Sequence, residues 1–370
     1  MNDELLKYKI GIALIPGIGF ITAKKLIAYV GSVEGVFKEK KSNLVKIPDI
    51  GSHLADNIVN HNVFDRGEKE IKFISQYNIK PFFYLDKDYP QRLINCYDAP
   101  LLLFAKGDVD FNQSKVISIV GTRNATERGR DICNELIGDL QQNGHNAIIV
   151  SGLAYGIDVV SHKAALKNNL KTIAVLGHGL DRIYPSSHTK VAKEIISKGA
   201  LLTEFLSYTN PDRANFVKRN RIIAGLSDAI IIVESAEKGG SLITADLANS
   251  YNRDVFAFPG RVNDKYSVGC NKFIKSNRAA LIENFKDLEY ILGWKAEETK
   301  QKVIQKELFV NLTDDEKIII EFLKENDKQS IDNICLKTQF PMSKVSAMLL
   351  NLEFSGIIKS LPGKYYSLRN

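Results

Sequence analysis

A short stretch near the middle of the sequence combines basic side chains with an aromatic ring. Residues 211–226 read PDRANFVKRNRIIAGL, with Arg213, Lys218, Arg219 and Arg221 set against one acid, Asp212, and with Phe216 between them. Cationic side chains follow a phosphate backbone while an aromatic ring stacks on any base, so this combination suits a groove for single-stranded nucleic acid. A charge run is commonly only a solvated helix face. Because this one opens a helical pattern beside an apolar run, we predict that Phe216 stacks on bases and that the three arginines contact phosphates.

A pair of glycines marks a second candidate contact. The apolar run that ends near Val233 leads into EKGGSLIT, so that Gly239, Gly240 and Ser241 precede a helical pattern containing Thr244. The first N–H groups of a helix have no partner within the helix and lie at the positive end of its dipole, which makes such a turn a phosphate cradle. The turn lacks the lysine and hydroxyl pair of a P-loop, so hydrolysis of a nucleoside triphosphate is not predicted.

Two further turns follow apolar runs and carry groups that bind anions. In SIVGTRN, Gly121 ends the run, and the guanidinium of Arg123 offers a planar fork of donors that matches phosphate. In IVSGLAYGID, Ser151 and Gly152 can present a hydroxyl and a backbone N–H to an anion. His162, on the helical pattern beyond, is interpreted as a packing residue. We predict that these turns complete the phosphate site.

The turn VLGHGLDRIYP matches a dinucleotide-binding fingerprint only in part. Gly177 and Gly179 follow an apolar run, but Arg182 occupies the third glycine position, which disfavours a dehydrogenase. Tyr184 either stacks on a base or anchors the packing beside Pro185. This turn therefore predicts no cofactor.

The elements that position these turns are seven short apolar runs with helical patterns between them: KVISIVG, NAIIVSG, KTIAVLG, GALLTE, DAIIIVES, RDVFAFPG and RAALIE. The runs are apolar at both alternate positions, as in strands that helices cover on both faces. The predicted fold class is α/β, a Rossmann-like doubly wound parallel sheet over residues 80–292, with residues 80–112 as an extended connector at its edge. Ligands of such sheets bind at the carboxyl ends of the strands, where these turns lie.

Smaller units flank the sheet. Residues 1–75 repeat a glycine turn before a helical pattern, IPGIG before TAKKLIAYV and IPDIG before SHLADNIVN, as in a helix-hairpin-helix or SAM-like helical domain. Asp49 replaces the Gly17 of the first copy and would repel phosphate, so DNA contact and a packing or docking role both stay open. Residues 293–310 are predicted as a linker, and residues 311–370 as a winged-helix-like domain that opens with Thr313 as N-cap.

Positive charge gathers in the centre of the chain. The net charge of the 370 residues is +7, and residues 115–290 hold 23 Lys and Arg against 18 Asp and Glu. A basic balance attracts polyanions. Residues 301–370 hold 10 against 9, so partner docking or autoregulation is favoured over DNA binding for the winged helix.

Composition and cysteine spacing narrow the class of protein. The 4 cysteines are scattered without a C-x-x-C pair, which argues against a disulfide framework and a zinc site. Acids near the first residue and the lack of a long apolar run indicate neither an export signal nor a membrane span. We predict a cytoplasmic protein with no metal, no cofactor and no membrane partner.

Seven motifs together resemble those of the DprA/Smf family of DNA-processing proteins: SIVGTR, SGLAYGID, TIAVLGHGLD, FVKRNRIIAGLS, EKGGSLITA, VFAFPG and GCNKFI, in that order over about residues 80–290. The resemblance implies a Rossmann-like core that forms a homodimer, binds single-stranded DNA with little sequence preference, protects it, and helps to load the RecA recombinase during natural transformation. It also implies that the DNA pocket includes Arg123, Arg213, Phe216, Gly240 and Ser241.

Two other functions are compatible with parts of the pattern. Lysine-decarboxylase-like nucleotide phosphoribohydrolases share this broad fold and a similar glycine turn, and their chemistry would assign Glu237 or Glu234 as the catalytic acid. A pure docking scaffold would leave the basic crevice without a role. Release of free base from a nucleoside monophosphate separates the first alternative from a DNA-binding protein, for which we predict no catalytic residue.

Overall fold

The computed structural model describes residues 3–294, 312–326, 328–355, 357–361 and 364–368. These residues fall into two compact units, which divide between residues 298 and 299. The first unit combines a helical N-terminal part with a large sheet, so the domain boundary predicted between residues 75 and 80 lies inside it. Within the described ranges, no helix is long and apolar enough to span a membrane.

The sheet of the first unit has nine strands in the described residues, in the order β1-β2-β6-β5-β4-β3-β7-β8-β9. Strands β3 to β9 are the seven predicted runs, and they pair in parallel with one another. Their bounds are Val116–Val120, Ile148–Ser151, Thr172–Val175, Ala200–Thr203, Ala229–Ile232, Asp254–Ala257 and Ala280–Leu281. The predicted doubly wound sheet is confirmed.

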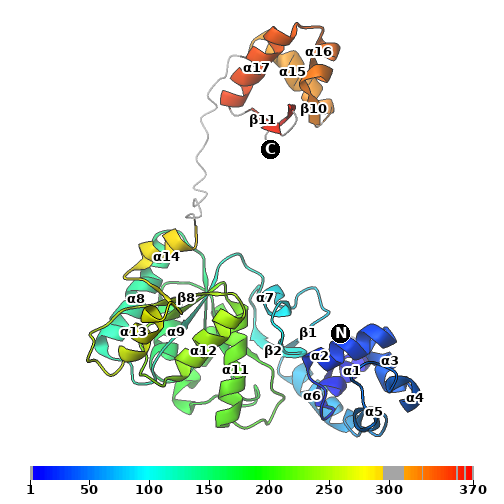
Figure 1. Ribbon diagram of the computed structural model, residues 1–370, viewed down its shortest axis with the longest axis vertical. Helices are drawn as coiled ribbons and strands as arrows, with labels where there is room; N and C mark the ends of the chain where they lie inside the picture. Colours follow the sequence, from blue (N-terminus) through cyan, green and yellow to red (C-terminus); the bar gives the residue numbers. More distant parts are fainter. Residues whose placement is uncertain (1–2, 295–311, 327, 356, 362–363, 369–370) are drawn as a thin grey trace. The chain divides into compact units, whose positions relative to one another are not determined.

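One edge of the sheet differs from the prediction of a parallel sheet with an extended connector. Strand β2 (Leu102–Gly107) pairs antiparallel with β6, and β1 (Lys80–Phe83) pairs antiparallel with β2. In Figure 1 these two strands lie between the N-terminal helices and the rest of the sheet. Gly107 has φ of +116°, and a Cβ there would lie 2.2 Å from the carbonyl oxygen of Gly199, so only glycine can end β2 against β6.

Helices cover both faces of the sheet. One face packs against α11, α12 and α13, and the other against α8, α9, α10 and α14. Neighbouring strand residues alternate between these cores, since Val116 and Val120 lie in one and Ile117 and Ile119 in the other, so the strands are mostly apolar on both faces. The bounds are α7 Gln91–Ile94, α8 Glu127–Gln142, α9 Ile157–Lys167, η1 Ser186–His188, α10 Thr189–Lys198, α11 Arg213–Leu226, α12 Gly240–Ser250, α13 Val268–Lys275 and α14 Phe285–Ile291.

The N-terminal part contains the two predicted helical hairpins. Gly17 and Asp49 both have positive φ, +82° and +66°, so the two turns share one left-handed conformation that aspartate tolerates. Asp49 also forms an ion pair with Lys25 of α2, which neutralises its carboxylate within the unit. The helices are α1 Asp3–Leu14, α2 Phe20–Val30, α3 Val33–Lys38, α4 Lys41–Leu44, α5 Ser52–Val59 and α6 Phe64–Gln76.

The second unit has the helices and the hairpin of the predicted winged helix. Its elements are α15 Asp314–Glu325, β10 Lys328–Ser330, α16 Ile331–Thr338, α17 Met342–Phe354, β11 Ile358–Leu361 and β12 Tyr365–Leu368. Thr313 caps α15 as predicted, in a capping box with Glu316. Strand β10 was not predicted because it has three polar residues. The predicted linker at 293–310 lies outside the described residues except for Gly293 and Trp294.

A buried carboxylate joins the N-terminal helices to the loop that leads into α11. The side chain of Glu70 on α6 is 3% exposed, and its oxygens accept the backbone N–H of Ser207 at 3.0 and 3.1 Å and the Ser207 hydroxyl at 2.6 Å. Arg66 donates to Glu70 Oε2 at 2.8 Å and to the Ser207 carbonyl oxygen at 2.7 Å. The loop of residues 204–212 is thereby held against α6.

Removal of this carboxylate should destabilise the first unit. In Glu70→Ala, the N–H of Ser207 and the Nη1 group of Arg66 lose their acceptor while they stay buried or partly buried, which costs about 1–3 kcal/mol. Denaturant unfolding measures this loss. The control is Glu68→Ala, because Glu68 is 58% exposed and lies 3.8 Å from Lys7, so its removal should change stability by less than about 1 kcal/mol. Equal losses in the two variants would contradict the assignment.

Candidate nucleic-acid interface

A small crevice opens at the switch point of the sheet. Strands that follow β3 along the chain first extend the sheet on one side as β4, β5 and β6, and then on the other as β7, β8 and β9. Doubly wound folds bind ligands at such a point, outside the carboxyl ends of the strands. The crevice has a volume of about 170 Å³, and predicted site residues that line it are Gly121, Arg123, Gly239, Gly240, Ser241 and Thr244. The fold therefore brings the β3 turn and the β7 turn together.

Hydrogen bonds hold these two turns side by side. The backbone N–H of Thr122 donates to the carbonyl oxygen of Glu234 at 2.8 Å. The carboxylate of Glu234, which is 4% exposed as a residue, accepts the N–H of Thr126 at 3.0 Å and also its hydroxyl, at the start of α8. A Cβ at Gly129 would lie 2.3 Å from this carboxylate. Glu234 thus caps a helix, and its position does not support a role as a catalytic acid.

The N-terminus of α12 faces the crevice without a capping side chain and without an acid in its first turn. At Gly239, the N-cap, an added Cβ would lie 2.3 Å from the Ser235 hydroxyl, so packing requires glycine. At Gly240 an added Cβ would meet no atom within 4 Å, and its φ lies outside the left-handed region. Neither packing nor backbone conformation requires glycine at 240, so its backbone is open to the crevice.

Two arginines, one exposed and one buried, bring positive charge to the crevice. Arg123 is exposed, lines the crevice, and has no hydrogen-bond or ion-pair partner among the described residues. Arg219 lies behind it and is 4% exposed. Burial lowers the pKa of Arg219 to about 10, Asp158 opposes this shift, and Arg123 adds to it. Arg219 is therefore a cation at neutral pH, close enough to Arg123 for the two charges to interact.

Three predicted contacts, Ser151, Gly152 and Arg219, do not line the crevice. Arg219 donates to the carbonyl oxygens of Gly152, at 2.7 Å, and Val175, and a Cβ at Gly152 would lie 2.2 Å from its guanidinium. The buried hydroxyl of Ser151 donates to the carbonyl oxygen of Ile119 at 2.6 Å. Carbonyl oxygens at the ends of buried strands need donors, and these side chains supply them. These side chains therefore have structural partners, and direct phosphate contact by the three residues stays a prediction.

The basic run on α11 is divided between different faces of the helix. Arg221 donates to Glu204 and to the carbonyl oxygen of Asp98, on the side away from the crevice, and its predicted phosphate contact stays a prediction. Asn220 lines the crevice. Arg213 is exposed at the first residue of α11, about 10 Å along the helix from Asn220. A helix turns by 100° per residue, so charges that are adjacent in sequence point in different directions; phosphate contact by Arg213 stays a prediction.

Phe216 lies beside the turn that follows β5. A Cβ at Gly177 would lie 2.7 Å from the Phe216 ring, and the ring centroid is 5.7 Å from that of Tyr184, which is 48% exposed. Phe216 itself is partly buried. The two rings form an aromatic pair outside the lining of the crevice, so base stacking on Phe216 stays a prediction.

The residues of the crevice that the sequence analysis missed include Asp158 and Asn220. Asp158 lines it, and burial raises the pKa of this carboxyl while Arg219 opposes the shift. Asn220 lines it from α11. Spacing alone offered a signal for Asn220, because positions 216, 220 and 223 share one helix face. Asp158 ends the SGLAYGID motif, but burial beside an arginine cannot be read from one sequence.

A phosphate-sized crevice at the switch point of a Rossmann-like sheet, lined by backbone N–H groups and an unpaired arginine, defines a class of anion-binding α/β proteins. Residues 80–292 match the family model of DNA recombination-mediator protein A, and residues 310–364 match that of the DprA winged helix domain. This chain belongs to the DNA recombination-mediator protein A family. The resemblance to the DprA/Smf family is thus confirmed.

Individual relatives agree with this assignment. The chain is 30% identical to protein Smf of Synechocystis over 405 residues, which covers 100% of both chains. The X-ray structure of DNA processing protein A from Streptococcus pneumoniae is 32% identical, with a TM-score of 0.66 over 78% of this chain and 97% of that one. A Helicobacter pylori structure, described as showing the single-stranded DNA binding mode of DNA processing protein A, is 30% identical, with a TM-score of 0.53 over 59% and 97%.

His162 is buried behind the crevice, 2.7 Å from the Thr172 hydroxyl, in the packing role predicted for it. Burial lowers the pKa of His162 to about 3 from the ordinary 6.5. The unfolded chain therefore binds a proton below pH 6.5 that the folded chain does not take up until about pH 3. The stability due to neutral His162 is full above pH 6.5 and is lost as the pH falls toward 3, by about 2 kcal/mol between pH 7 and 5.

Between pH 7 and pH 5 the parent should lose about 2 kcal/mol of unfolding free energy because of His162. We expect the His162→Gln variant not to show this loss. Denaturant unfolding at the two pH values measures the difference. The exposed His53→Gln variant is the control and should keep the parent's pH dependence. A His162→Gln protein with the parent's pH dependence would contradict the assigned shift.

Proposed function

We propose that this chain binds single-stranded DNA through the crevice between the β3 and β7 turns and acts as a recombination mediator. The observation that carries the proposal is the open N-terminus of α12 at Gly240, in the same crevice as the unpaired guanidinium of Arg123. A phosphate there would receive backbone N–H donors and a cation. The single-stranded DNA binding named for the related Helicobacter pylori protein supports the proposal.

The size of the crevice supports a strand over a free nucleotide. Small-molecule pockets have volumes of roughly 300–1,000 Å³, whereas this crevice has about 170 Å³. It suits one phosphate of a strand whose other parts lie outside. Glu234 is engaged in the cap of α8, and Glu237 is 61% exposed with Lys272 at 3.6 Å. These positions favour a non-catalytic DNA-binding protein over a phosphoribohydrolase.

In the proposed role the protein holds and protects incoming single strands in the cytoplasm and helps to load them onto RecA during transformation. Unpaired bases can stack on side chains, whereas bases in a duplex cannot, so the protein should prefer single-stranded to double-stranded DNA. Arg213 and Phe216, near the first turn of α11, would extend the contact beyond the crevice. Family membership supports this role, and the winged helix would serve docking or autoregulation.

The double variant Arg123→Ala with Arg213→Ala should bind single-stranded DNA much more weakly. Each phosphate contact on a single strand contributes about 0.7 to the slope of log affinity against log salt, so two lost contacts should reduce the slope by about 1.4. Fluorescence titrations of labelled single- and double-stranded oligonucleotides over a range of salt concentrations measure both quantities. The melting temperature should stay close to that of the parent, since both arginines are exposed and neither side chain forms a hydrogen bond or ion pair with another described residue.

The matched control is Lys190→Ala with Lys193→Ala on α10, which removes two exposed cations that do not line the crevice. It should keep the parent's affinity and salt slope. If the arginine variant also keeps them, the crevice is not the DNA site. If the parent binds single and double strands equally, base stacking has no part in recognition.

We also propose that the protein forms a homodimer through the sheet-containing core. Family resemblance supports this, and no self-complementary sequence pattern does. We expect multi-angle light scattering at micromolar concentration to give twice the chain mass of 41.4 kDa. A monomer with and without DNA would refute the proposal.

A further inference from the structure

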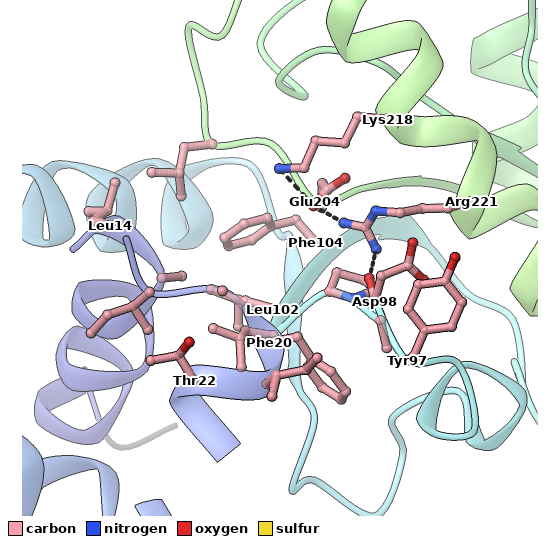
Figure 2. Close-up of a pocket in the computed structure, with 18 residues that line it drawn as sticks. Leu14, Phe20, Thr22, Tyr97, Asp98, Leu102, Phe104, Glu204, Lys218 and Arg221 are labelled. Atoms are coloured by element: carbon pink, nitrogen blue, oxygen red, sulfur yellow. Dashed lines mark hydrogen bonds and ion pairs between the residues drawn. The ribbon is translucent and has the colours of Figure 1, made fainter. Parts of the chain in front are cut away.

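A second, larger cavity lies between the N-terminal helices and the sheet within the first unit (Figure 2). Its volume is about 520 Å³, which is in the range of small-molecule and cofactor sites. In Figure 2, Phe104 of β2 lies at its centre, with Lys218 and Arg221 of α11 above. Helix α11 thus has one side at this cavity and another, with Asn220, at the crevice.

The N-terminus of α2 opens into this cavity. Its first-turn residues Phe20, Ile21 and Thr22 line the cavity together with the N-cap, Gly19. No side chain caps the helix, and its first turn holds no acid. An added Cβ at Gly19 would meet no atom within 4 Å, and its φ is −97°, so neither packing nor conformation requires glycine there. The first N–H groups of α2 have no acceptor within the helix and suit an anion.

Lys218 and Arg221 share one acid, Glu204, at the opposite wall. The Glu204 side chain is 8% exposed, and its Oε2 accepts from Arg221 and from Lys218 at 3.3 Å. Its Oε1 has no hydrogen-bond partner among the described residues. An unpaired carboxylate oxygen calls for a donor and not for an anion, so the case for an anionic ligand at this wall rests on the two cations that share this one acid. The Lys218 side chain is 56% exposed, which leaves its ammonium accessible to a ligand.

Tyr97 adds an accessible aromatic ring to the same cavity. It is 59% exposed, and its ring is tilted by 62° against that of Tyr251 at a centroid distance of 5.5 Å. A helix N-terminus and an exposed lysine favour an anionic ligand. The apolar side chains that line the cavity and the tyrosine ring favour a planar aromatic group. A nucleotide of a single strand has both features, and a stacking ring beside cations is the usual means of holding one.

We propose that this cavity is a second subsite for the same DNA strand, in which the α2 N-terminus and Lys218 hold a phosphate and Tyr97 stacks on a base. The proposal rests on the proposed function, because the strand is the one that binds at the crevice on the other side of α11. The N-terminal helices then add a contact to the strand through the first backbone N–H groups of α2.

The test is a matched pair of variants at the second residue of α2 and of α5. Ile21→Asp places a carboxylate in the first turn of α2, at the cavity, and His53→Asp places one at the same position of α5, which does not line it. Both residues are exposed, and an acid in a first turn favours a helix, so both proteins should fold. We expect Ile21→Asp to weaken binding roughly tenfold, equivalent to about 1.4 kcal/mol, and His53→Asp to leave it unchanged. The probe is a labelled single strand of about 20 nucleotides, longer than a site of roughly 4–16 nucleotides.

Two further variants separate charge from stacking. Lys218→Gln should lower the salt slope by about 0.7, as one phosphate contact does. Tyr97→Ala should weaken binding by about fivefold or more at an unchanged salt slope, because stacking involves no counterion. Lys193→Gln on α10 is the control for the lost lysine and should bind like the parent.

The outcomes distinguish this inference from the function on which it rests. If the Arg123 and Arg213 double variant loses binding while Ile21→Asp, Lys218→Gln and Tyr97→Ala bind like the parent, the crevice is the DNA site and the cavity is not; a protein partner is then its candidate occupant. If the parent does not bind the single strand, the proposed function fails and this inference fails with it. Selective loss in the cavity variants, with unchanged melting temperatures, supports the second subsite.

Discussion

The buried guanidinium of Arg219 is the interaction on which the candidate interface depends. It donates to the carbonyl oxygens of Gly152 and Val175, at the carboxyl ends of β4 and β5, and so attaches α11 to the sheet. Glycine is required at 152 because a Cβ there would lie 2.2 Å from the guanidinium. Asp158 offsets part of the cost of burying this charge. The result is a fixed cation behind a crevice whose other donors are backbone N–H groups.

Helix α11 connects the parts of the molecule that the proposals assign to DNA. The loop before it is held by Glu70 of α6, so the N-terminal helices contribute to the position of its first turn. One side of α11 lines the crevice through Asn220, and another side lines the larger cavity through Lys218 and Arg221. A strand that contacts both sides would be bound by the sheet turns and by the N-terminal helices together. Two sites of modest affinity on one strand then give a higher overall affinity, because binding at the second site becomes intramolecular once the first is occupied.

Much of the fold could be predicted because its strands are buried on both faces. Val116 and Ile117 enter different cores, so both faces of β3 are mostly apolar, and the run is visible in the sequence. The turns after β3 and β7 were predicted together for a related reason, since parallel strands place their carboxyl ends at one edge. Strand β2 was read as a connector because its antiparallel pairing with β6 depends on a partner almost a hundred residues away. Pairing partners of this kind leave no local pattern.

The sequence by itself determined the class of fold, the turns that meet at the switch point and the excess of positive charge, since these follow from local periodicity, glycine spacing and composition. Only the tertiary structure decided which charges line the crevice and which have partners within the protein. Arg123 is unpaired at the crevice, Arg219 is buried against carbonyl oxygens, and Arg221 pairs with Glu204 on another side of the helix. In the sequence these are three similar arginines. Their roles differ because burial and partners are set by residues distant along the chain, which an arginine's own neighbours do not reveal.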